Sequence, residues 1–330
     1  MGRGLWLCDG FELQHPTTCT RDSCRWCRHA SDSRTRITGE SVGTRADFGG
    51  LMRIQFTKMH GLGNDFVVID AVSQHISLRP SQVSKLADRH TGIGFDQLLL
   101  IEPPSRPDAD FDYRIFNSDG GEVEHCGNGA RCFAKFVTDR ALTAKQHITV
   151  NTAKGLIELT LTEDGLVRVN MGQPNWEPSA LPFTGPAPEG TSMSVDLPTS
   201  NGITPCGLVS MGNPHAVIRV DDVDSADVAG LGQEIQSMDA FPQSVNVGFL
   251  EVISESAVRL RVFERGVGET LACGTGACAA VAWGHRCGWL GTQVTVATRG
   301  GNLQIEWQGL GHDLLMIGPA ESVFEGEFRL

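Results

Sequence analysis

The alternation of hydrophobic and polar residues predicts many short strands and a few helices from residue 52 onward. Alternating or continuous apolar runs predict strands over residues 52–59, 66–70, 98–101, 113–116, 148–152, 156–161, 166–171, 206–218 (two strands around a loop), 246–250, 258–263, 294–297, 303–307 and 314–317. Apolar residues at helical spacing predict helices over residues 80–90, 129–139, 228–235 and 277–283. The segment 174–205, rich in Pro, Gly and Ser, predicts a crossover between two domains.

One pattern occurs twice along the chain. A Phe that ends a predicted strand stands ten residues before each of two cysteines, Cys126 and Cys273. Each Cys opens a Cys-Gly-X-Gly-Ala sequence that leads into a predicted helix. A loop bearing an asparagine precedes each Cys as well, with Asn64 62 residues before the first and Asn213 60 residues before the second. A repeat of this length indicates a duplication of whole domains rather than a solenoid.

The predicted fold class is therefore α+β, with two pseudo-symmetric domains. Each domain is expected to be a mostly antiparallel sheet wrapped around a central helix, whose Cys-bearing start points at the junction between the domains. The expected boundaries are residues 52–172 plus 318–330 for the N-terminal domain and 173–317 for the C-terminal domain.

Residues 1–51 differ from the rest, with seven arginines, no lysine and no amphipathic period. We interpret this leader as disordered or untranslated, with Met52 as the true start. A transit peptide is an alternative, although six acidic residues fit it badly. A zinc site is another, and its ligands would be Cys24 and Cys27 together with Cys8, Cys19 or His29.

Composition narrows the class of protein. The chain has 330 residues, 40% hydrophobic and 20% charged, which is typical of a soluble protein with two ordinary domains. Its net charge of −12 argues against nucleic acid as a partner, because phosphate binding requires a basic face. No apolar run is long enough to span a membrane. Ten cysteines without a disulfide-like spacing or a secretory signal indicate reduced thiols and a cytoplasmic protein.

The repeated cysteines carry the candidate chemistry. A Cys at a Gly-rich turn before a helix lies beside unpaired N–H groups and the positive end of the helix dipole, so we expect a lowered thiol pKa. The same N–H groups can bind a carboxylate. Two such sites predict a pair of thiols acting on one substrate from opposite sides. Two Gly-X-Gly sequences, at residues 61–63 and 92–94, lack the third glycine and the following helix of a dinucleotide site.

Taken together, five segments resemble the diaminopimelate epimerase family over residues 52–330. These segments are 58–66, 95–97, 126–132, 211–215 and 264–277, the last two containing Met211-Gly212-Asn213-Pro214-His215 and Glu264-Arg265 with the Cys273 motif. The resemblance implies two pseudo-symmetric domains with the active site between them. It also implies interconversion of LL- and meso-diaminopimelate for lysine and peptidoglycan precursors, with neither pyridoxal phosphate nor a metal ion.

The resemblance also implies roles for individual residues. Cys126 and Cys273 are the expected acid and base thiols, and His215 and Glu264 are expected to tune them. The expected substrate-binding residues are Asn64, Gln97, Asn117, Gly127, Asn128, Asn213, Asn246, Glu264, Arg265, Gly274 and Thr275. No partner beyond the small-molecule substrate is implied, apart from a second copy of the chain in a homodimer.

Two other interpretations remain open at this level. A proline racemase or hydroxyproline epimerase also uses paired cysteines, but acts on a cyclic imino acid without a distal amino-acid end. The several asparagines and Arg265, a natural bidentate partner for a carboxylate, favour a longer substrate with two zwitterionic ends. A thiol redox protein is the rival from another class, and activity that persists under strong reductant would distinguish the epimerase from it.

Overall fold

The computed structural model describes residues 53–123, 127–186 and 194–329. The interpretations of the leader, including its candidate zinc ligands, concern residues outside the described part of the chain. No helix among the described residues is long and apolar enough to cross a membrane.

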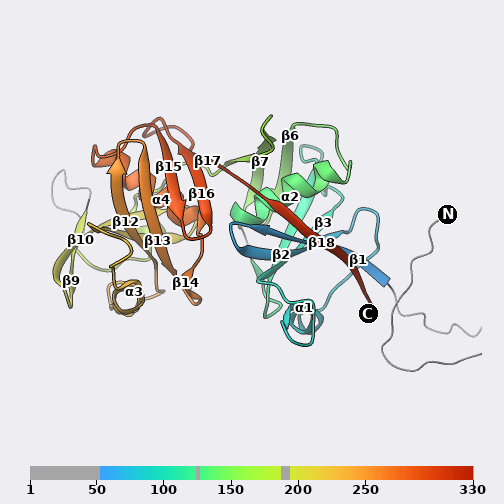
Figure 1. The fold of residues 1–330 in the computed structure, drawn as a ribbon, viewed down its shortest axis with the longest axis horizontal. Coiled ribbons are helices and arrows are strands. Elements are labelled where there is room, and N and C mark those ends of the chain that lie inside the picture. The colour runs from blue at the N-terminus through green and yellow to red at the C-terminus, as the bar shows by residue number, and fades with distance from the viewer. Residues whose placement is uncertain (1–52, 124–126, 187–193, 330) are drawn as a thin grey trace, which may run out of the picture. The chain divides into compact units, whose positions relative to one another are not determined.

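The first half of the described chain is built from strands β1–β8, with the last strand, β18, and two helices. Its elements are β1 (Arg53–Gly61), β2 (Asn64–Asp70), α1 (Pro80–Ala87), β3 (Gln97–Glu102), β4 (Phe111–Asn117), β5 (Glu122–Val123), α2 (Gly127–Asp139), β6 (His147–Thr152), β7 (Gly155–Leu161), β8 (Val167–Asn170) and β18 (Glu321–Arg329). Its sheet curves around α2 (Figure 1).

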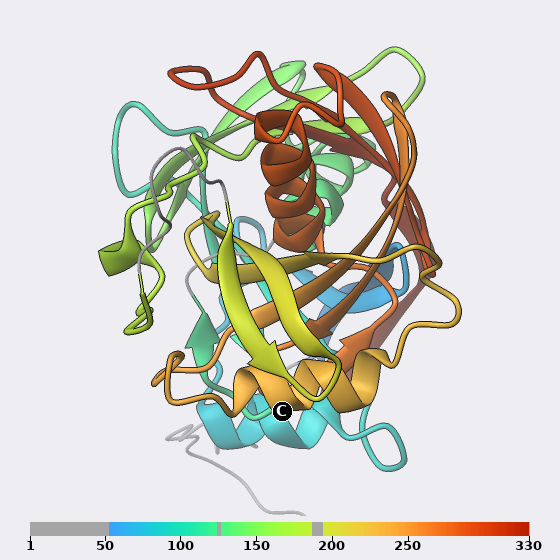
Figure 2. The same ribbon diagram turned by 90° about the vertical axis from the view of Figure 1, so that its left-hand side faces the viewer.

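The second half repeats this plan with strands β9–β17 and two further helices. After the 3-10 helix η1 (Pro178–Ala180), its elements are β9 (Val195–Thr199), β10 (Gly202–Ser210), β11 (Pro214–Arg219), α3 (Val228–Gln236), β12 (Asn246–Ser254), β13 (Ala257–Glu264), β14 (Gly268–Thr270), α4 (Gly274–Arg286), β15 (Gln293–Thr298), β16 (Gly301–Glu306) and β17 (Leu315–Gly318). Figure 2 shows α4 enclosed by these strands.

Strand pairing is the same in the two halves. In the first, β1 pairs with β18 and β2, β2 runs parallel to β3, and β4 runs parallel to β6. In the second, β10 pairs with β9 and β11, β11 runs parallel to β12, and β13 runs parallel to β15. The equivalent strands β8 and β17 pair with each other and join the halves. The predicted α+β fold with two similar halves is therefore confirmed, and we propose that the domain boundaries fall at residues 172/173 and 317/318.

The central helices are held by close packing. All but three residues of α4 are buried, as its apolar sequence predicts, and Trp283 is 1% exposed. Gly207 of β10 leaves room for this indole, because a Cβ at that position would lie 2.3 Å from the ring. In the first half, Phe133 of α2 stacks edge-on against Phe111 and Tyr113 of β4. Both helix axes are therefore fixed by packing against their own sheet.

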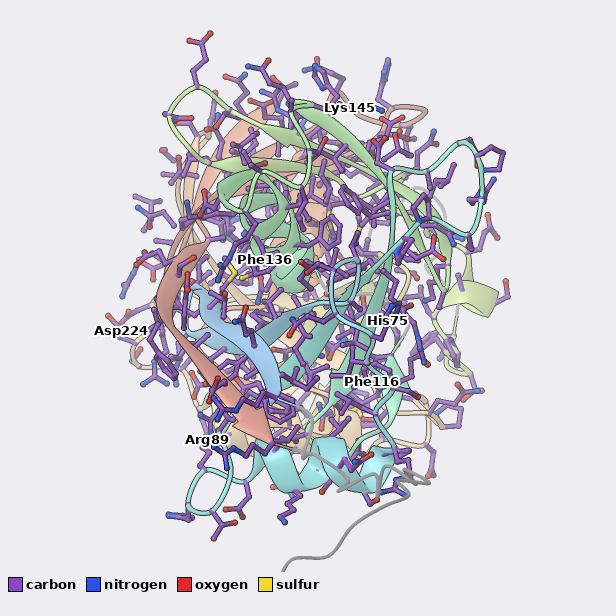
Figure 3. The ribbon with its side chains drawn as sticks, turned by 90° about the vertical axis from the view of Figure 1, so that its right-hand side faces the viewer. His75, Arg89, Phe116, Phe136, Lys145 and Asp224 are labelled. Atoms are coloured by element: carbon purple, nitrogen blue, oxygen red, sulfur yellow. The ribbon has the colours of Figure 1, made fainter. Side chains whose placement is uncertain are left out.

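Several details differ from the sequence prediction. Helix α1 ends at Ala87 rather than His90, because the Asp88 carboxylate accepts hydrogen bonds from the backbone N–H groups of His90 and Thr91 and turns the chain. The short strands β5 and β14 and the longer strands β9 and β18 were not predicted. Strand β9 lies inside the Pro- and Gly-rich crossover, and β18 is a largely exposed edge strand, visible beside β1 in Figure 3.

Candidate active site

The starts of α2 and α4 lie next to each other. A Cβ on Gly127, the first residue of α2, would lie 2.9 Å from the methyl carbon of Met316, and one on Gly274, the first residue of α4, would lie 3.0 Å from its sulfur. Asn128 of α2 donates a hydrogen bond of 3.3 Å from its side-chain nitrogen to the carbonyl of Ala272. The two helix starts are thus in direct contact across the halves.

Cys273 is the N-cap residue of α4, and its thiol has two polar neighbours. The sulfur donates to Glu264 Oε2 at 3.3 Å and lies 3.6 Å from Thr275 Oγ1. The other carboxylate oxygen of Glu264 accepts a hydrogen bond of 2.5 Å from Thr270 Oγ1. Glu264 is therefore oriented by Thr270 with one oxygen aimed at the thiol.

The thiol pKa runs opposite to the sequence expectation. Burial raises the pKa of Cys273 well above its usual value, and the Glu264 carboxylate raises it further. The Thr275 hydroxyl and the Gly276 N–H act in the other direction but are weaker. Burial also raises the pKa of Glu264. The lowered thiol pKa expected from the helix N-terminus was therefore wrong. Burial of the thiol and the nearby carboxylate of Glu264, at the end of β13, raise the pKa by more than the helix start lowers it.

His215 lies behind the thiol rather than against it. Its ring is fully buried, and its Nε2 is 3.1 Å from Asn213 Oδ1. Asn213 in turn donates from Nδ2 to Thr275 Oγ1 at 3.3 Å. Burial lowers the pKa of His215 to about 3, helped by the charge of Arg265, so the ring is neutral near pH 7. A neutral ring that donates from Nε2 fixes the Asn213 amide with its nitrogen toward Thr275.

Asn246, at the start of β12, is hydrogen-bonded to Arg265, which directly follows β13. The Asn246 side chain donates to the Pro214 carbonyl at 3.0 Å and accepts from the backbone N–H of Arg265 at 2.9 Å. The Arg265 guanidinium donates to the Gln243 carbonyl at 3.2 Å. Asn246 is 4% exposed, so it shapes the loop that carries Arg265 instead of facing solvent.

In the first half, Gln97 and Asn117 occupy the register positions of Asn246 and Glu264. Gln97 Nε2 donates to Asn117 Oδ1 at 2.9 Å, and Gln97 Oε1 is buried without a hydrogen-bond partner. Such an acceptor is available to a ligand donor. Asn64 begins β2 on the same side.

A charged cluster anchors this side of the site. Arg89, labelled in Figure 3 near α1, donates to both oxygens of Asp65 at 2.9 and 2.8 Å and to Asp96 at 2.7 Å. Lys58 lies 2.6 Å from Asp65. Asp65 and Asp96 directly precede Phe66 and Gln97, which are paired in the parallel β2–β3 ladder. The cluster therefore fixes the ends of the strands that carry Asn64 and Gln97.

A cavity of about 1570 Å³ opens between these groups. The predicted site residues that line it are Asn64, Gln97, Asn117, Gly127, Asn128, Asn213, Glu264, Arg265, Cys273, Gly274 and Thr275. His215 and Asn246 lie behind its wall. Cys126 falls outside the described residues, although the next residue, Gly127, lines the cavity.

Sequence reasoning missed two residues, Thr270 and Arg131. Thr270 orients Glu264, and Arg131 is a fully buried cation that donates to Asn128 Oδ1 at 3.0 Å. Aligning the two copies on their cysteines would have revealed both, because Thr270 takes the place of Val123 and Arg131 that of Cys278. Within the described ranges, no three His, Cys, Asp or Glu side chains are grouped as metal ligands would be.

The fold matches those of solved proteins of low sequence identity. A hydroxyproline epimerase from Agrobacterium vitis superposes with a TM-score of 0.60 at 16% identity, covering 84% of this chain and 93% of that one. A PhzF-family phenazine biosynthesis protein from Bacillus anthracis gives 0.61 at 17% identity, covering 84% and 99%. At these identities the likeness shows the fold, a duplicated α+β architecture that this chain shares with an epimerase and a PhzF-family protein.

The particular family follows from sequence. The family model described as diaminopimelate epimerase matches residues 56–177 and 207–323. The diaminopimelate epimerase of Chromobacterium violaceum is 57% identical over 279 residues, which is 84% of this chain and all of that protein. The chain belongs to the diaminopimelate epimerase family.

Proposed function

We propose that this protein interconverts LL- and meso-2,6-diaminopimelate with two thiols, Cys126 and Cys273, and no cofactor, in the synthesis of lysine and peptidoglycan precursors. The observation that carries this proposal is the contact between the two helix starts. It puts Cys273 at one start and the residue that follows Cys126 at the other, on the wall of one cavity. The family relationship, at 57% identity, supports the same activity.

The reaction inverts one carbon, so a proton must leave one face of the Cα and another must arrive on the opposite face. The Cα–H of an amino acid is a very weak acid, and its carbanion needs strong electrostatic support. We assign this support to the N–H groups at the starts of α2 and α4, near Gly127, Asn128, Gly274 and Thr275, which would hold the α-carboxylate. One thiolate removes the proton while the other thiol donates one, and the roles exchange in reverse.

Cys273 is built to hold both protonation states. As a thiol it donates to Glu264, and as a thiolate it can accept from the Thr275 hydroxyl, 3.6 Å away. Because Asn213 donates to the Thr275 oxygen, the Thr275 proton is free to point toward sulfur. His215 contributes by orienting Asn213. Its proposed tuning of the thiol therefore passes through two intervening side chains.

The rest of the substrate would be bound by the cavity wall. Arg265 offers the guanidinium fork that suits the distal carboxylate. Asn64, Gln97, Asn117 and Asn213 offer amide groups for the distal ammonium and carboxylate, with the buried Gln97 Oε1 as an open acceptor. Asn246 would act through the Arg265 backbone, to which it is bonded.

We also propose a homodimer in the cytoplasm. The dimer is suggested by β18, an edge strand that exposes Val323 at 56% and Phe324 at 49%. An exposed edge with apolar side chains is a surface that pairs with a second copy. The cytoplasm is suggested by chemistry, since the two thiols must stay reduced to act.

The decisive experiment is incubation with LL-diaminopimelate in deuterated water, following deuterium at the α-carbon and the stereoisomer formed. We expect exchange together with meso product, in the presence of chelator and reductant. Cys126→Ala or Cys273→Ala should abolish turnover, and either Ser variant should lower it by about 10²–10⁴-fold. Cys287→Ser, outside the cavity, is the matched control. Wild-type turnover in Cys126→Ser, or turnover of proline instead, would contradict the proposal.

A further inference from the structure

Arg131 lies one turn inside α2, fully buried beneath the two helix starts. Figure 2 shows α2 behind α4, and Arg131 contacts the sulfur of Met316 in β17 of the second half at 3.6 Å. Its Nε donates to the Pro319 carbonyl at 3.0 Å, in the segment between β17 and β18. Its terminal nitrogens donate to Asn128 Oδ1 at 3.0 Å and reach the Gly127 carbonyl at 3.5 Å.

The space around the guanidinium is shaped for it. Strands β1 and β17 each end in a glycine at this point, Gly61 and Gly318. A Cβ on either would lie 3.2 Å from an Arg131 nitrogen, and Met316 Sδ lies 3.6 Å from another. A buried cation costs free energy unless its donors are used. The Arg131 guanidinium therefore occupies a buried pocket whose size is set by Gly61, Gly318 and Met316.

The guanidinium determines how the Asn128 amide is oriented. A guanidinium only donates hydrogen bonds, so it must face the amide oxygen. The Asn128 nitrogen then points to the Ala272 carbonyl, one residue before the Cys273 thiol. A short relay of contacts therefore runs from Arg131 through Asn128 to the loop that carries the second thiol.

The duplication explains why the cation occurs once. Arg131 stands five residues after Cys126, and Cys278 stands five residues after Cys273. Burial raises the pKa of the Cys278 thiol, and the nearby Arg131 charge is the opposing influence. The equivalent position in the second half thus carries a small buried thiol in place of a cation.

We propose that Arg131 is a positioning residue for the reaction, fixing Asn128 and with it the spacing of the two helix starts, while its charge favours the anions that form between them. This inference rests on the proposed function, since it assigns the anions to that reaction. A purely structural arginine would affect unfolding alone. A positioning arginine must also change turnover and the ionisation of the thiol.

The test compares Arg131→Met and Arg131→Lys with the unaltered protein. Each is measured for kcat and KM with LL-diaminopimelate, for its unfolding temperature, and for the pH dependence of Cys273 alkylation by iodoacetamide, read by peptide mass spectrometry. Arg131→Met should lower kcat by about 10²-fold with a smaller change in KM. Its alkylation midpoint should rise by about half a pH unit to one unit, because a cation that favours the thiolate is lost.

Arg131→Lys should keep the alkylation midpoint, since it retains the charge, while kcat falls because an ammonium lacks the planar fork. The charged group facing Cys273, Glu264, is unchanged in both variants. Arg140→Gln is the matched control, because Arg140 follows α2 and bonds to Thr57 and Glu325 away from the cavity. It should leave kcat and the midpoint unaltered.

A folded Arg131→Met with wild-type kcat, or with an unshifted midpoint, would overturn the inference while leaving the deuterium result for the unaltered protein intact. If Arg131→Met does not fold, Arg131→Lys decides alone. A lower kcat at an unchanged unfolding temperature supports the positioning role, and a wild-type kcat rejects it.

Discussion

The Cys273 thiol donates a 3.3 Å hydrogen bond to the buried carboxylate of Glu264, so the sulfur and the carboxylate share one proton. The carboxylate stabilises the thiol over the thiolate, because two adjacent negative charges repel each other in a buried site. In the proposed reaction Cys273 would therefore start as the acid.

Replacing Glu264 with Gln should lower the pKa of Cys273, since the second-largest cause of its increase is removed. At a fixed pH near 8, alkylation of Cys273 should become faster, while epimerisation falls by about 10–10³-fold because the proton acceptor is lost. Peptide mapping of the alkylated protein measures the first effect and polarimetry the second. Glu102→Gln, outside the cavity, should change neither. Slower alkylation in the Glu264 variant would contradict the assignment.

His215 should make stability depend on pH. Its folded-state pKa of about 3 lies below the unfolded value of about 6.5, so the unfolded chain binds a proton that the native ring refuses. Stability should then fall as pH decreases below 6.5, with a slope of up to about 1.4 kcal/mol per pH unit. Urea denaturation between pH 7 and 4.5 measures it. His215→Gln should flatten the slope, whereas substitution of the exposed His312 should not.

Lys58→Met should destabilise the first half by about 3 kcal/mol, because it leaves the Asp65 charge partly buried without one of its partners. The side chains of this pair are only 10% and 18% exposed. Arg53→Met is the control, since its pair with Glu327 is 61% and 48% exposed and should contribute about 0–0.5 kcal/mol. Equal losses in the two variants, measured by denaturant unfolding, would argue against the ranking.

The same pair has a defined pH window. Burial opposes ionisation of Asp65, but hydrogen bonds from Arg89 and Lys58 hold its pKa well below the usual range. A depressed folded pKa contributes stability above the unfolded value of about 3.9 that is lost as pH falls toward the folded one. The difference between Lys58→Met and the unaltered protein should therefore shrink below about pH 4. Denaturation series at pH 6 and pH 3 test this.

Gly207→Ala should cost about 1–3 kcal/mol, because the added carbon would lie 2.3 Å from the Trp283 ring, and neither group can move easily. Gly248→Ala is the matched control in the same half. There a Cβ meets its neighbours at 3.6 Å or more, an ordinary contact. Thermal unfolding of the two variants should separate them clearly, and similar unfolding temperatures would contradict the packing argument.

Sequence patterns predicted those helices and strands whose formation depends on residues close together in the chain. Helix α4 was expected from its apolar sequence, and it ends at Arg286, two residues before Gly288, whose φ of 76° favours glycine. Strand β18 escaped prediction because its partner, β1, begins at Arg53, which pairs with Arg329 at the other end of the chain. A pattern of neighbouring residues cannot indicate that two segments so far apart in the chain will pair.

For the candidate site, the sequence identified the residues but not the contacts that they make. The repeated Cys motif and the family resemblance named eleven residues that line the cavity. They did not reveal that His215 and Asn246 lie behind its wall, or that Glu264 accepts a hydrogen bond from the Cys273 thiol. Those facts depend on which side chains meet across strands, so burial and hydrogen bonding had to come from the structure.

The position of β18 also bears on how the duplication arose. In the second half the edge strand β9 precedes its partner β10, whereas in the first half the equivalent strand, β18, comes last in sequence. The two copies are therefore related by a circular permutation, in which one strand has moved from the start of the copy to its end. The chain must be completed to Arg329 before its first copy can close, so a protein shortened before Glu321 would keep an intact second copy and an open first one.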